Sequence, residues 1–466
     1  MVSVFSREES LPSVSLRNAA QRFATGSVAR SLHVAAISFA ALAAAMTTAP
    51  VQAQIGLYEV ARFDLSLTAS ATGGAYIGSN PTAVAWNGSR LWVAGYNGTG
   101  AAGTTSMIEI TNATSQGLVT PTYSSPFGTI ASVPNTRGYT GLAISGTLIG
   151  ASFDLGSNSQ NGIQGFSTAN QKLWDLSASG TNTANIGTTR GYAGPAFDPG
   201  FQGNPAQGSG LAWVTQGQGR RFLNDSVSGS SIYTTTANVP TGAQQGMIIN
   251  TNPVSTNWRD LAFDPATGDL YTRTNGNVTR TNRTGANTVR SPSGVNGQSD
   301  LIFTTATANN NLGNNLGYMN GVTSGTFNSF VNNYAGDLIV FNDRASTAGG
   351  QSPLSVIKFL TTSGTAITPT WTFINGATPA NGSGLYDFSW DPSSQTLAVV
   401  DFSNRGVSIF STAVPEPSTW AMAGMAGTAL AGHSLLKARR RRKPAGGSPP
   451  ADDSSGDDAP DPREPA

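Results

Sequence analysis

The chain of 466 residues is long enough for one large domain with targeting segments at its ends. Only 11% of its residues are charged and the formal net charge is +1, which is unlike a nucleic-acid-binding protein with its basic face, so we expect no nucleic-acid partner. Cysteine is absent, which excludes a disulfide framework, a thiolate metal site and a cysteine nucleophile.

Residues 1–53 are predicted to be a signal peptide. The apolar run at 34–46 is too short to span a bilayer and has the length of a signal h-region. Val51 and Ala53 follow it at the small-residue positions of a cleavage site. We therefore expect the mature chain to begin near Gln54, the alternative being a buried Ala-rich helix.

Residues 54–413 form the predicted ectodomain, whose composition restricts its chemistry. Both histidines of the chain, His33 and His433, lie outside it, so a Ser-His-Asp triad, a histidine zinc site and a histidine pH switch are excluded there. The segment has 16 acidic and 15 basic residues and is rich in Thr, Ser, Asn and Gly, which disfavour helices. An all-β domain with a nearly neutral surface is predicted.

Two stretches of the ectodomain share one pattern. Residues 259–273, "RDLAFDPATGDLYTR", and residues 386–400, "YDFSWDPSSQTLAVV", align as D-[LF]-[AS]-[FW]-D-P-x-[ST]-x-x-L. The Asp-Pro pairs at 264–265 and 391–392 suit a turn, because Pro fixes φ and Asp bonds the turn backbone. Each stretch is predicted to be a pair of antiparallel strands joined by that turn.

Looser relatives of the pattern begin at Thr82, Thr140, Ser209 and Tyr334. Units that start about 50 to 70 residues apart, each with room for three or four short strands, favour a β-propeller of about six blades. Residues 57–67 stand before the first unit and are expected to complete the last blade, which would cover an exposed sheet edge. A β-helix, whose rungs would recur near every 20 residues, or a sandwich is the alternative.

Carboxylates are the main candidates for chemistry in the ectodomain. Asp264 and Asp269 are weak candidates for calcium ligands, with a solvated turn as the alternative. Other aspartates fall at or near predicted strand ends, where a propeller channel would gather paired carboxylates able to act as acid and base or to hold a metal; turn capping is the alternative. These are Asp154, Asp198, Asp260, Asp337, Asp343, Asp387 and Asp401.

Aromatic residues are candidates for stacking against sugar rings. The set comprises Trp86, Trp92, Trp174, Trp213, Trp258, Trp371, Trp390, Tyr96, Tyr139 and Tyr192. Aromatic residues within predicted strands more often pack between blades. We therefore expect Trp86, Trp213 and Trp390 to belong to the core.

The C-terminal part of the chain has the pattern of a membrane anchor. Residues 418–436 carry no charge over about 19 positions, enough for a transmembrane helix. A basic cluster then follows, made of Lys437, Arg439, Arg440, Arg441, Arg442 and Lys443. By the positive-inside rule this orientation places residues 54–413 outside the cytoplasm, the alternative being a Gly-rich terminal helix packed on the domain.

Residues 414–443 closely resemble the PEP-CTERM sorting signal of Gram-negative and related bacteria. Val414, Pro415, Glu416 and Pro417 supply the motif, followed in order by the apolar helix and the arginines. The resemblance implies recognition by an exosortase, a membrane-embedded cysteine-dependent transpeptidase, with cleavage near the tripeptide and transfer to the cell surface or extracellular matrix. Unlike most such signals, this one is followed by an acidic, Pro-rich tail at 444–466, which we expect to be disordered.

Two functions of different classes follow. The first is a non-enzymatic surface or matrix protein that binds exopolysaccharide, because proteins with this signal are often associated with exopolysaccharide and biofilm. The alternative is a carboxylate-dependent or calcium-dependent hydrolase or lyase, which requires three or more of the aspartates to converge in one channel. No cofactor is expected other than the calcium of this alternative.

Overall fold

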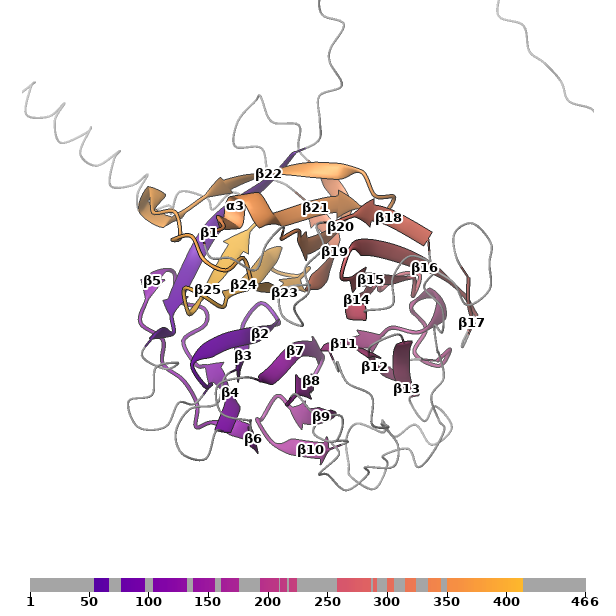
Figure 1. The fold of residues 1–466 in the computed structure, drawn as a ribbon, viewed down its shortest axis with the longest axis horizontal. Helices are drawn as coiled ribbons and strands as arrows, with labels where there is room; N and C mark the ends of the chain where they lie inside the picture. The colour runs from indigo at the N-terminus through magenta and orange to yellow at the C-terminus, as the bar shows by residue number, and fades with distance from the viewer. Residues whose placement is uncertain are drawn as a thin grey trace, which may run out of the picture.

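The structure is a computed structural model. It describes residues 54–66, 77–96, 104–131, 137–155, 161–175, 193–208, 210–215, 218–223, 258–285, 288–290, 300–305, 315–323, 334–344 and 350–413. The regular secondary structure of these residues is almost entirely β-strand, arranged around a centre in the manner of a β-propeller (Figure 1). The predicted all-β class is confirmed.

The strands pair into antiparallel meanders, which we call blades 1 to 6 in chain order from β2. Blade 1 contains β2 (Asn80–Trp86), β3 (Leu91–Tyr96), β4 (Thr104–Ile110) and β6 (Phe127–Ala131). Blade 2 contains β7 (Gly138–Ser145), β8 (Leu148–Asp154), β9 (Asn161–Ser167) and β10 (Lys172–Asp175). Blade 3 contains β11 (Ala193–Asp198), β12 (Gly210–Thr215) and β13 (Gln218–Leu223), with the 3₁₀ turn η3 (Phe201–Gly203) after β11.

Blade 4 contains β14 (Trp258–Phe263), β15 (Leu270–Thr274), β16 (Asn277–Gly285) and β18 (Asp300–Thr304), and β17 (Thr288–Arg290) also pairs with β16. Blade 5 contains β19 (Leu316–Thr323), β20 (Ala335–Asn342), β21 (Ile357–Thr361) and β22 (Ala366–Thr372), with α3 (Pro353–Val356) before β21. Blade 6 contains β23 (Tyr386–Asp391), β24 (Thr396–Asp401) and β25 (Gly406–Ser411), and η5 (Ile374–Gly376) precedes it.

The ring is closed by the first strand of the described chain. β1 (Gln54–Asp64) pairs antiparallel with β25, with Tyr58 opposite Ser411 and Asp64 opposite Gly406. The expectation that residues 57–67 complete the last blade is thus confirmed for β1. On the inner side, each blade's first strand contacts the first strand of the next blade, and β23 contacts β2.

Two of the predicted units begin one strand too late. The unit expected from Ser209 starts on β12, the second strand of blade 3, and the unit expected from Tyr334 starts on β20, the second strand of blade 5. Their first strands, β11 and β19, read "AGPAFD" and "LGYMNGVT". Glycines and a proline dilute the apolar alternation of these strands, so they give a weak strand signal.

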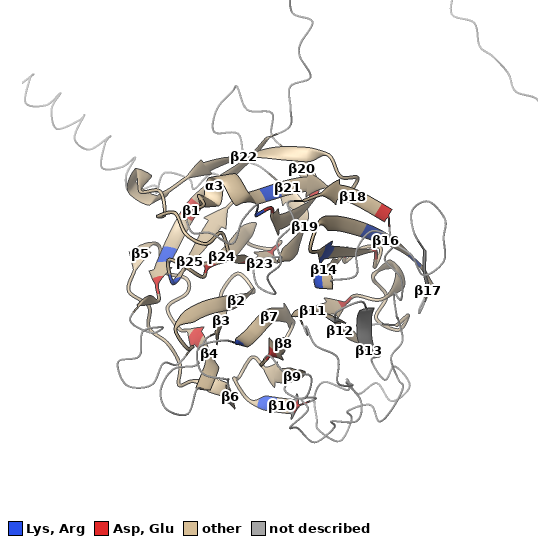
Figure 2. Ribbon diagram, in the orientation of Figure 1, with Lys and Arg blue, Asp and Glu red and all other residues tan. Residues whose placement is uncertain are grey.

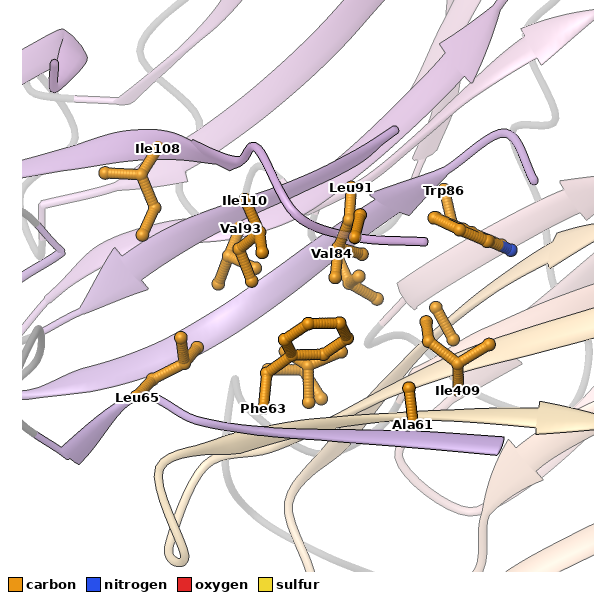
Figure 3. Close-up of a cluster of buried hydrophobic side chains, with 14 of the residues drawn as sticks. Ala61, Phe63, Leu65, Val84, Trp86, Leu91, Val93, Ile108, Ile110 and Ile409 are labelled. Carbon is orange, nitrogen blue, oxygen red and sulfur yellow. The ribbon is translucent and has the colours of Figure 1, made fainter. Parts of the chain in front are cut away.

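The interface between blades 6 and 1 shows how β1 is held. Phe63 is completely buried and, with Ala61, points from β1 toward Val84 and Val93 of blade 1 (Figure 3). Burying a side chain of this size contributes about 1.5–3 kcal/mol. The closing strand is therefore fixed by apolar packing as well as by its hydrogen bonds to β25.

Blades 5 and 6 are joined at their outer edges. β22 pairs with β21 of its own blade through Ile367 and Ala366, and then runs parallel to β1, with Gln54 opposite Thr368 and Tyr58 opposite Thr372. A single sheet therefore runs from β19 to β23 through β22 and β1. Because β19 also contacts β23 near the axis, the two blades enclose a barrel-like space.

The predicted targeting segments cannot be placed in this architecture. Residues 1–53 and 414–466, including the predicted signal peptide, span and acidic tail, lie outside the described residues. Within the described ranges there is no helix with the length and apolar character needed to cross a bilayer.

Candidate functional site

Two buried aspartates on the innermost strands join neighbouring blades. Asp260 on β14 and Asp387 on β23 occupy equivalent positions in the repeated pattern. Asp260 accepts the backbone N–H of Leu316 in blade 5 at 2.6 Å, and Asp387 accepts that of Val84 in blade 1 at 2.9 Å. Each carboxylate thus fixes the inner strand of its own blade to that of the next.

Uncharged side chains also link neighbouring blades here. Asn315, directly before β19, is at the position that corresponds to Asp260, and its amide donates to the carbonyl of Tyr386 on β23 at 2.8 Å. In blade 1 the link comes from Thr82, one residue before the corresponding position, whose hydroxyl donates to the carbonyl of Tyr139 on β7 at 2.9 Å. A polar side chain at or next to this position is therefore an element of the architecture, whether or not it is acidic.

An axial cavity of about 330 Å³ lies against these strands, with walls from β7, β11, β14, β19 and β23. Burial raises the pKa of Asp387, which lines it, to about 7. Burial and the negative charge of Asp387 raise the pKa of Asp260 well above its ordinary value. A protonated carboxylic acid is thus favoured here at neutral pH, because both side chains are buried and two carboxylates at one cavity would repel each other.

The remaining candidate aspartates are engaged in separate places. Asp198, which also lines the axial cavity, forms a completely buried ion pair with Arg283 on β16 at 2.9 Å. The others meet different partners: Asp154 pairs with Arg137 at 2.9 Å, Asp337 accepts from the Tyr318 hydroxyl at 2.9 Å, and Asp401 accepts from the Asn404 amide at 2.7 Å. Three of the candidates, Asp198, Asp260 and Asp387, do line one axial cavity, as the hydrolase or lyase alternative requires. All three are engaged there, Asp198 with Arg283 and the other two with the backbone of a neighbouring blade.

The two calcium candidates have structural roles in the described chain. Asp264 caps its own turn by accepting the backbone N–H of Ala266 at 2.7 Å and of Thr267 at 3.2 Å. Asp269 accepts from the Arg280 guanidinium at 2.7 Å and from the backbone of Arg283 at 2.9 Å. No group of three or more His, Asp or Glu side chains suited to a metal ion occurs in the part of the chain that the structure describes.

A larger cavity, of about 580 Å³, lies between blades 5 and 6, and we call it the interblade pocket. Its apolar wall contains Pro353, Ile357, Trp371, Phe373, Tyr386, Val399 and Phe410. Polar side chains around it are those of Arg62, Asp64, Ser66, Thr120, Asp401, Asn404 and Ser408, and Leu118 on β5 (Gly117–Val119) completes the lining. β5 reaches the pocket because it pairs with β1 beside Arg62.

The aromatic rings of the interblade pocket form one cluster. Trp371 and Phe373 lie parallel, with ring centroids 6.3 Å apart and planes 6° apart. Phe410 meets Trp371 edge to face at 5.0 Å, and the Arg62 guanidinium lies over Phe373 at 5.9 Å from the ring centroid. Arg62 also forms a bidentate pair with Glu59, at 2.6 and 2.5 Å, so its positive charge is balanced.

The interblade pocket was not predicted from the sequence, although Trp371 was among the aromatic candidates. Its signal is the alternation of aromatic residues in "TWTF" at 370–373, which places Trp371 and Phe373 on one side of the chain. The pocket itself depends on β22 leaving blade 5 to pair with β1. That pairing joins residues more than 300 positions apart, and no local sequence pattern predicts it.

Most of the other aromatic candidates are core residues. Trp86, Trp92, Trp213, Trp258, Tyr96 and Tyr139 are buried. Trp390 is only partly buried, and its indole N–H donates to the carbonyl of Asn320 at 3.0 Å. The side chain of Trp174 and all of Tyr192 lie outside what the structure describes.

Charged residues are sparse and of mixed sign. Figure 2 shows Lys and Arg interspersed with Asp and Glu over the blades. Several opposite charges are directly paired, as in Arg90 with Glu109 at 2.7 Å. A ligand of the described domain would therefore meet no face dominated by one sign of charge.

The comparisons with known proteins concern the C-terminal signal and the fold. Residues 413–442 match the family of the PEP-CTERM protein-sorting motif, which confirms the resemblance of this segment and implies processing by an exosortase. Among solved structures, the chain is similar to the β-propeller domain of Myceliophteria thermophila Cps50 (Swd1), at 12% identity and a TM-score of 0.30, covering 71% of this chain and 96% of that one. No curated protein matches the sequence.

The predicted sorting residues themselves are beyond the described part of the chain. Val414, Pro415, Glu416, Pro417 and the basic cluster lie past Ala413, the last described residue, and Val51 and Ala53 lie before Gln54. Because β1 and β25 are antiparallel and Tyr58 is opposite Ser411, the chain enters and leaves the propeller at the same end of blade 6. The matched motif begins two residues after β25 ends.

Proposed function

We propose that this protein is an exported cell-surface or extracellular-matrix component, sorted by an exosortase, whose β-propeller is a non-enzymatic module that binds neutral polysaccharide. Residues 1–53 would direct export, residues 418–436 would hold the precursor in the membrane, and cleavage near Pro415, Glu416 and Pro417 would release the domain. The observation that carries the proposal is the PEP-CTERM match at residues 413–442, directly after a closed propeller.

Three features of the described domain support a binding role. The ectodomain contains neither His nor Cys, and its candidate carboxylates cap turns, pair with arginines or link blades. Its surface is rich in Thr, Ser and Asn, whose hydroxyls and amides both donate and accept hydrogen bonds, as the hydroxyls of sugars do. The chain also offers a large pocket with an aromatic wall and polar groups around it.

The sorting step can be tested with the full-length chain carrying an epitope tag between Ala53 and Gln54, directly before β1. We expect the tag to appear in the surface or medium fraction of cells that have the exosortase and to remain in the membrane fraction of cells that lack it. Exchanging Pro415, Glu416 and Pro417 for alanines should retain the tag in the membrane in both strains. Equal distribution of the unaltered chain in the two strains would refute exosortase sorting.

The binding role has its own test. The full-length precursor, purified in detergent, is applied to an array of neutral and acidic polysaccharides. We expect retention on at least one neutral polysaccharide. If no polysaccharide retains the protein, the binding role is wrong, whereas the sorting role stands on the fractionation.

A further inference from the structure

The geometry points to the interblade pocket between blades 5 and 6 as the site that holds the sugar rings of a neutral oligosaccharide. This inference rests on the proposed binding function and adds its location and its preference for uncharged sugars.

The pocket exists because two blades share an outer edge. In a propeller the faces of neighbouring blades pack at the axis and diverge outward. Here the diverging edges of blades 5 and 6 are linked by the parallel pairing of β22 with β1. The apolar cluster containing Ile55, Leu57 and Phe388 packs between the two blades, and the pocket is the space left against Trp371, Tyr386 and Phe410.

The size of the pocket suits a small ligand. Its volume of about 580 Å³ falls in the middle of the range of about 300–1,000 Å³ that is usual for small-molecule sites. Such sites combine an apolar, aromatic wall with a few polar groups that orient the ligand. The interblade pocket has both, whereas the axial cavity is smaller, at about 330 Å³, and is lined by carboxylates already committed to linking blades.

The wall of the pocket offers aromatic rings. Trp371 is half-buried and borders the pocket together with Phe373 and Phe410. A sugar ring suits such a wall, because its C–H groups suit the negative face of an aromatic ring while its hydroxyls bond to the polar groups around the pocket.

The polar groups around the pocket set the charge of the ligand. Asp64 and Asp401 supply carboxylates that accept from sugar hydroxyls, and burial raises the pKa of Asp401 although hydrogen bonds from Asn404 act against this. The cation in the lining, Arg62, is balanced by Glu59. A uronic acid or sulfated sugar would bring a negative charge next to these aspartates without a free cation to meet it, so neutral sugars are preferred.

The position of these groups agrees with a surface-displayed site. Asp64 and Asp401 lie at the end of blade 6 where Gly406 and Tyr386 begin their strands. The chain is attached to its predicted anchor at the other end, beyond Ser411 and Gln54. At about 3.3 Å per residue, β1 separates the two ends by roughly 30 Å. The polar side of the pocket is therefore remote from the attachment point.

The experiment is calorimetric titration of the full-length precursor in detergent with glucose-based and N-acetylglucosamine-based neutral oligosaccharides and with uronic-acid oligosaccharides of equal length. We expect one neutral series to bind and the uronic series to bind at least tenfold more weakly. Trp371→Ala should weaken binding at least tenfold, and Trp371→Phe, which keeps a ring and loses the N–H donor, should weaken it less.

Leu118→Asp gives a second variant that does not depend on the aromatic core. Leu118 is 61% exposed in the lining of the pocket, so the change leaves the fold intact while adding a charge and removing apolar area. The matched control is Leu301→Asp on β18, where the leucine is 43% exposed and lies outside the pocket. We expect Leu118→Asp to weaken binding at least fivefold and the control to bind as the unaltered chain does.

The outcomes separate the location from the function. Unchanged binding in both Trp371→Ala and Leu118→Asp would place the sugar elsewhere and overturn the inference, while the proposed binding role would stand. Tighter binding of the uronic series would refute the preference for neutral sugars. If the unaltered chain binds no oligosaccharide but is retained by a polysaccharide on the array, the assignment of the pocket is wrong and the proposed binding role stands. If the chain binds neither the oligosaccharides nor any polysaccharide on the array, both the pocket assignment and the binding role are refuted.

Discussion

Asp387 makes the stability of the propeller depend on pH in a direction opposite to that of most carboxylates. Its side chain is only 5% exposed, and its one cross-blade bond is to the backbone N–H of Val84. Burial raises its pKa from 3.8 to about 7 in the folded chain. In the unfolded chain an aspartate titrates near pH ~3.9. Between these two values the folded state binds a proton that the unfolded state has lost.

The sign and size of the effect follow from this difference. The free energy of unfolding decreases as pH rises wherever the folded state binds more protons than the unfolded state. The stabilising contribution of Asp387 is therefore complete below pH ~4 and is lost as pH rises through 7. A shift of about three units corresponds to about 4 kcal/mol. This value is a ceiling, because relaxation around the ionised group reduces its cost.

Asp387→Asn removes the titration and keeps the hydrogen bond. The amide oxygen of the variant accepts the Val84 N–H as the carboxylic acid does, while the side chain stays neutral at every pH. We expect the variant to exceed the unaltered chain by up to about 1.5 kcal/mol at pH 5 and by up to about 4 kcal/mol at pH 8. The assay is urea unfolding followed by circular dichroism at pH 5, 6, 7 and 8.

Ser389→Ala is the matched control for this experiment. Ser389 lies two residues further on β23 and accepts the N–H of Trp86 on the same neighbouring strand at 2.9 Å, without a titratable group. Its loss should lower stability by about 1 kcal/mol equally at all four pH values. If the stability of Asp387→Asn falls with pH in parallel with that of the unaltered chain, the buried carboxylate is not the cause and the reasoning is wrong.

Two further changes test the contacts between blades by urea unfolding. Gly194→Ala would place a Cβ 2.0 Å from an Asp260 oxygen and 2.6 Å from the Asp260 Cα, so we expect the free energy of unfolding to fall by more than about 3 kcal/mol. The control is Gly146→Ala, where φ is similarly positive but no atom lies within 4 Å of the added Cβ. There we expect a decrease of about 1–2 kcal/mol. Arg283→Met leaves the buried Asp198 carboxylate without its cation, so stability should fall by about 3–5 kcal/mol, and adding Asp198→Leu should restore most of it. Equal losses in the two glycine variants, or no loss in Arg283→Met, would contradict these assignments.

The parts of the fold that the sequence predicted are those with strong local signals. The Asp-Pro turns were recognised because proline and the capping aspartate act within three residues, and Asp264 and Asp391 cap as expected. A third turn of this kind, at Asp198 and Pro199, also caps through Gly200 but was not recognised as a unit. It follows a strand with three small residues and a proline, so the turn matches the repeated pattern but the strand does not.

Only single residues of the candidate site were predictable from the sequence. Trp371 on β22 is an aromatic candidate, but its neighbour Phe410 comes from β25, and Arg62 over Phe373 comes from β1, at the other end of the domain sequence. Their meeting depends on closure of the ring, which is a long-range event that hydrophobic periodicity does not encode. The same closure brings Asp198, Asp260 and Asp387, from three different blades, to one axial cavity.

Closure of the ring separates the fold of the propeller from the sorting motif. The last blade is completed by β1, and the last described contact into this blade beyond β25 is that of Thr412, whose backbone N–H donates to the carbonyl of Gln395 at 3.0 Å. The matched sorting motif begins at residue 413, outside every strand of the propeller. Cleavage near Pro415 would therefore remove no hydrogen-bonded strand and no residue of the interblade pocket. We expect the propeller to keep its fold after such cleavage, because the sorting motif and the strands are separate parts of the chain.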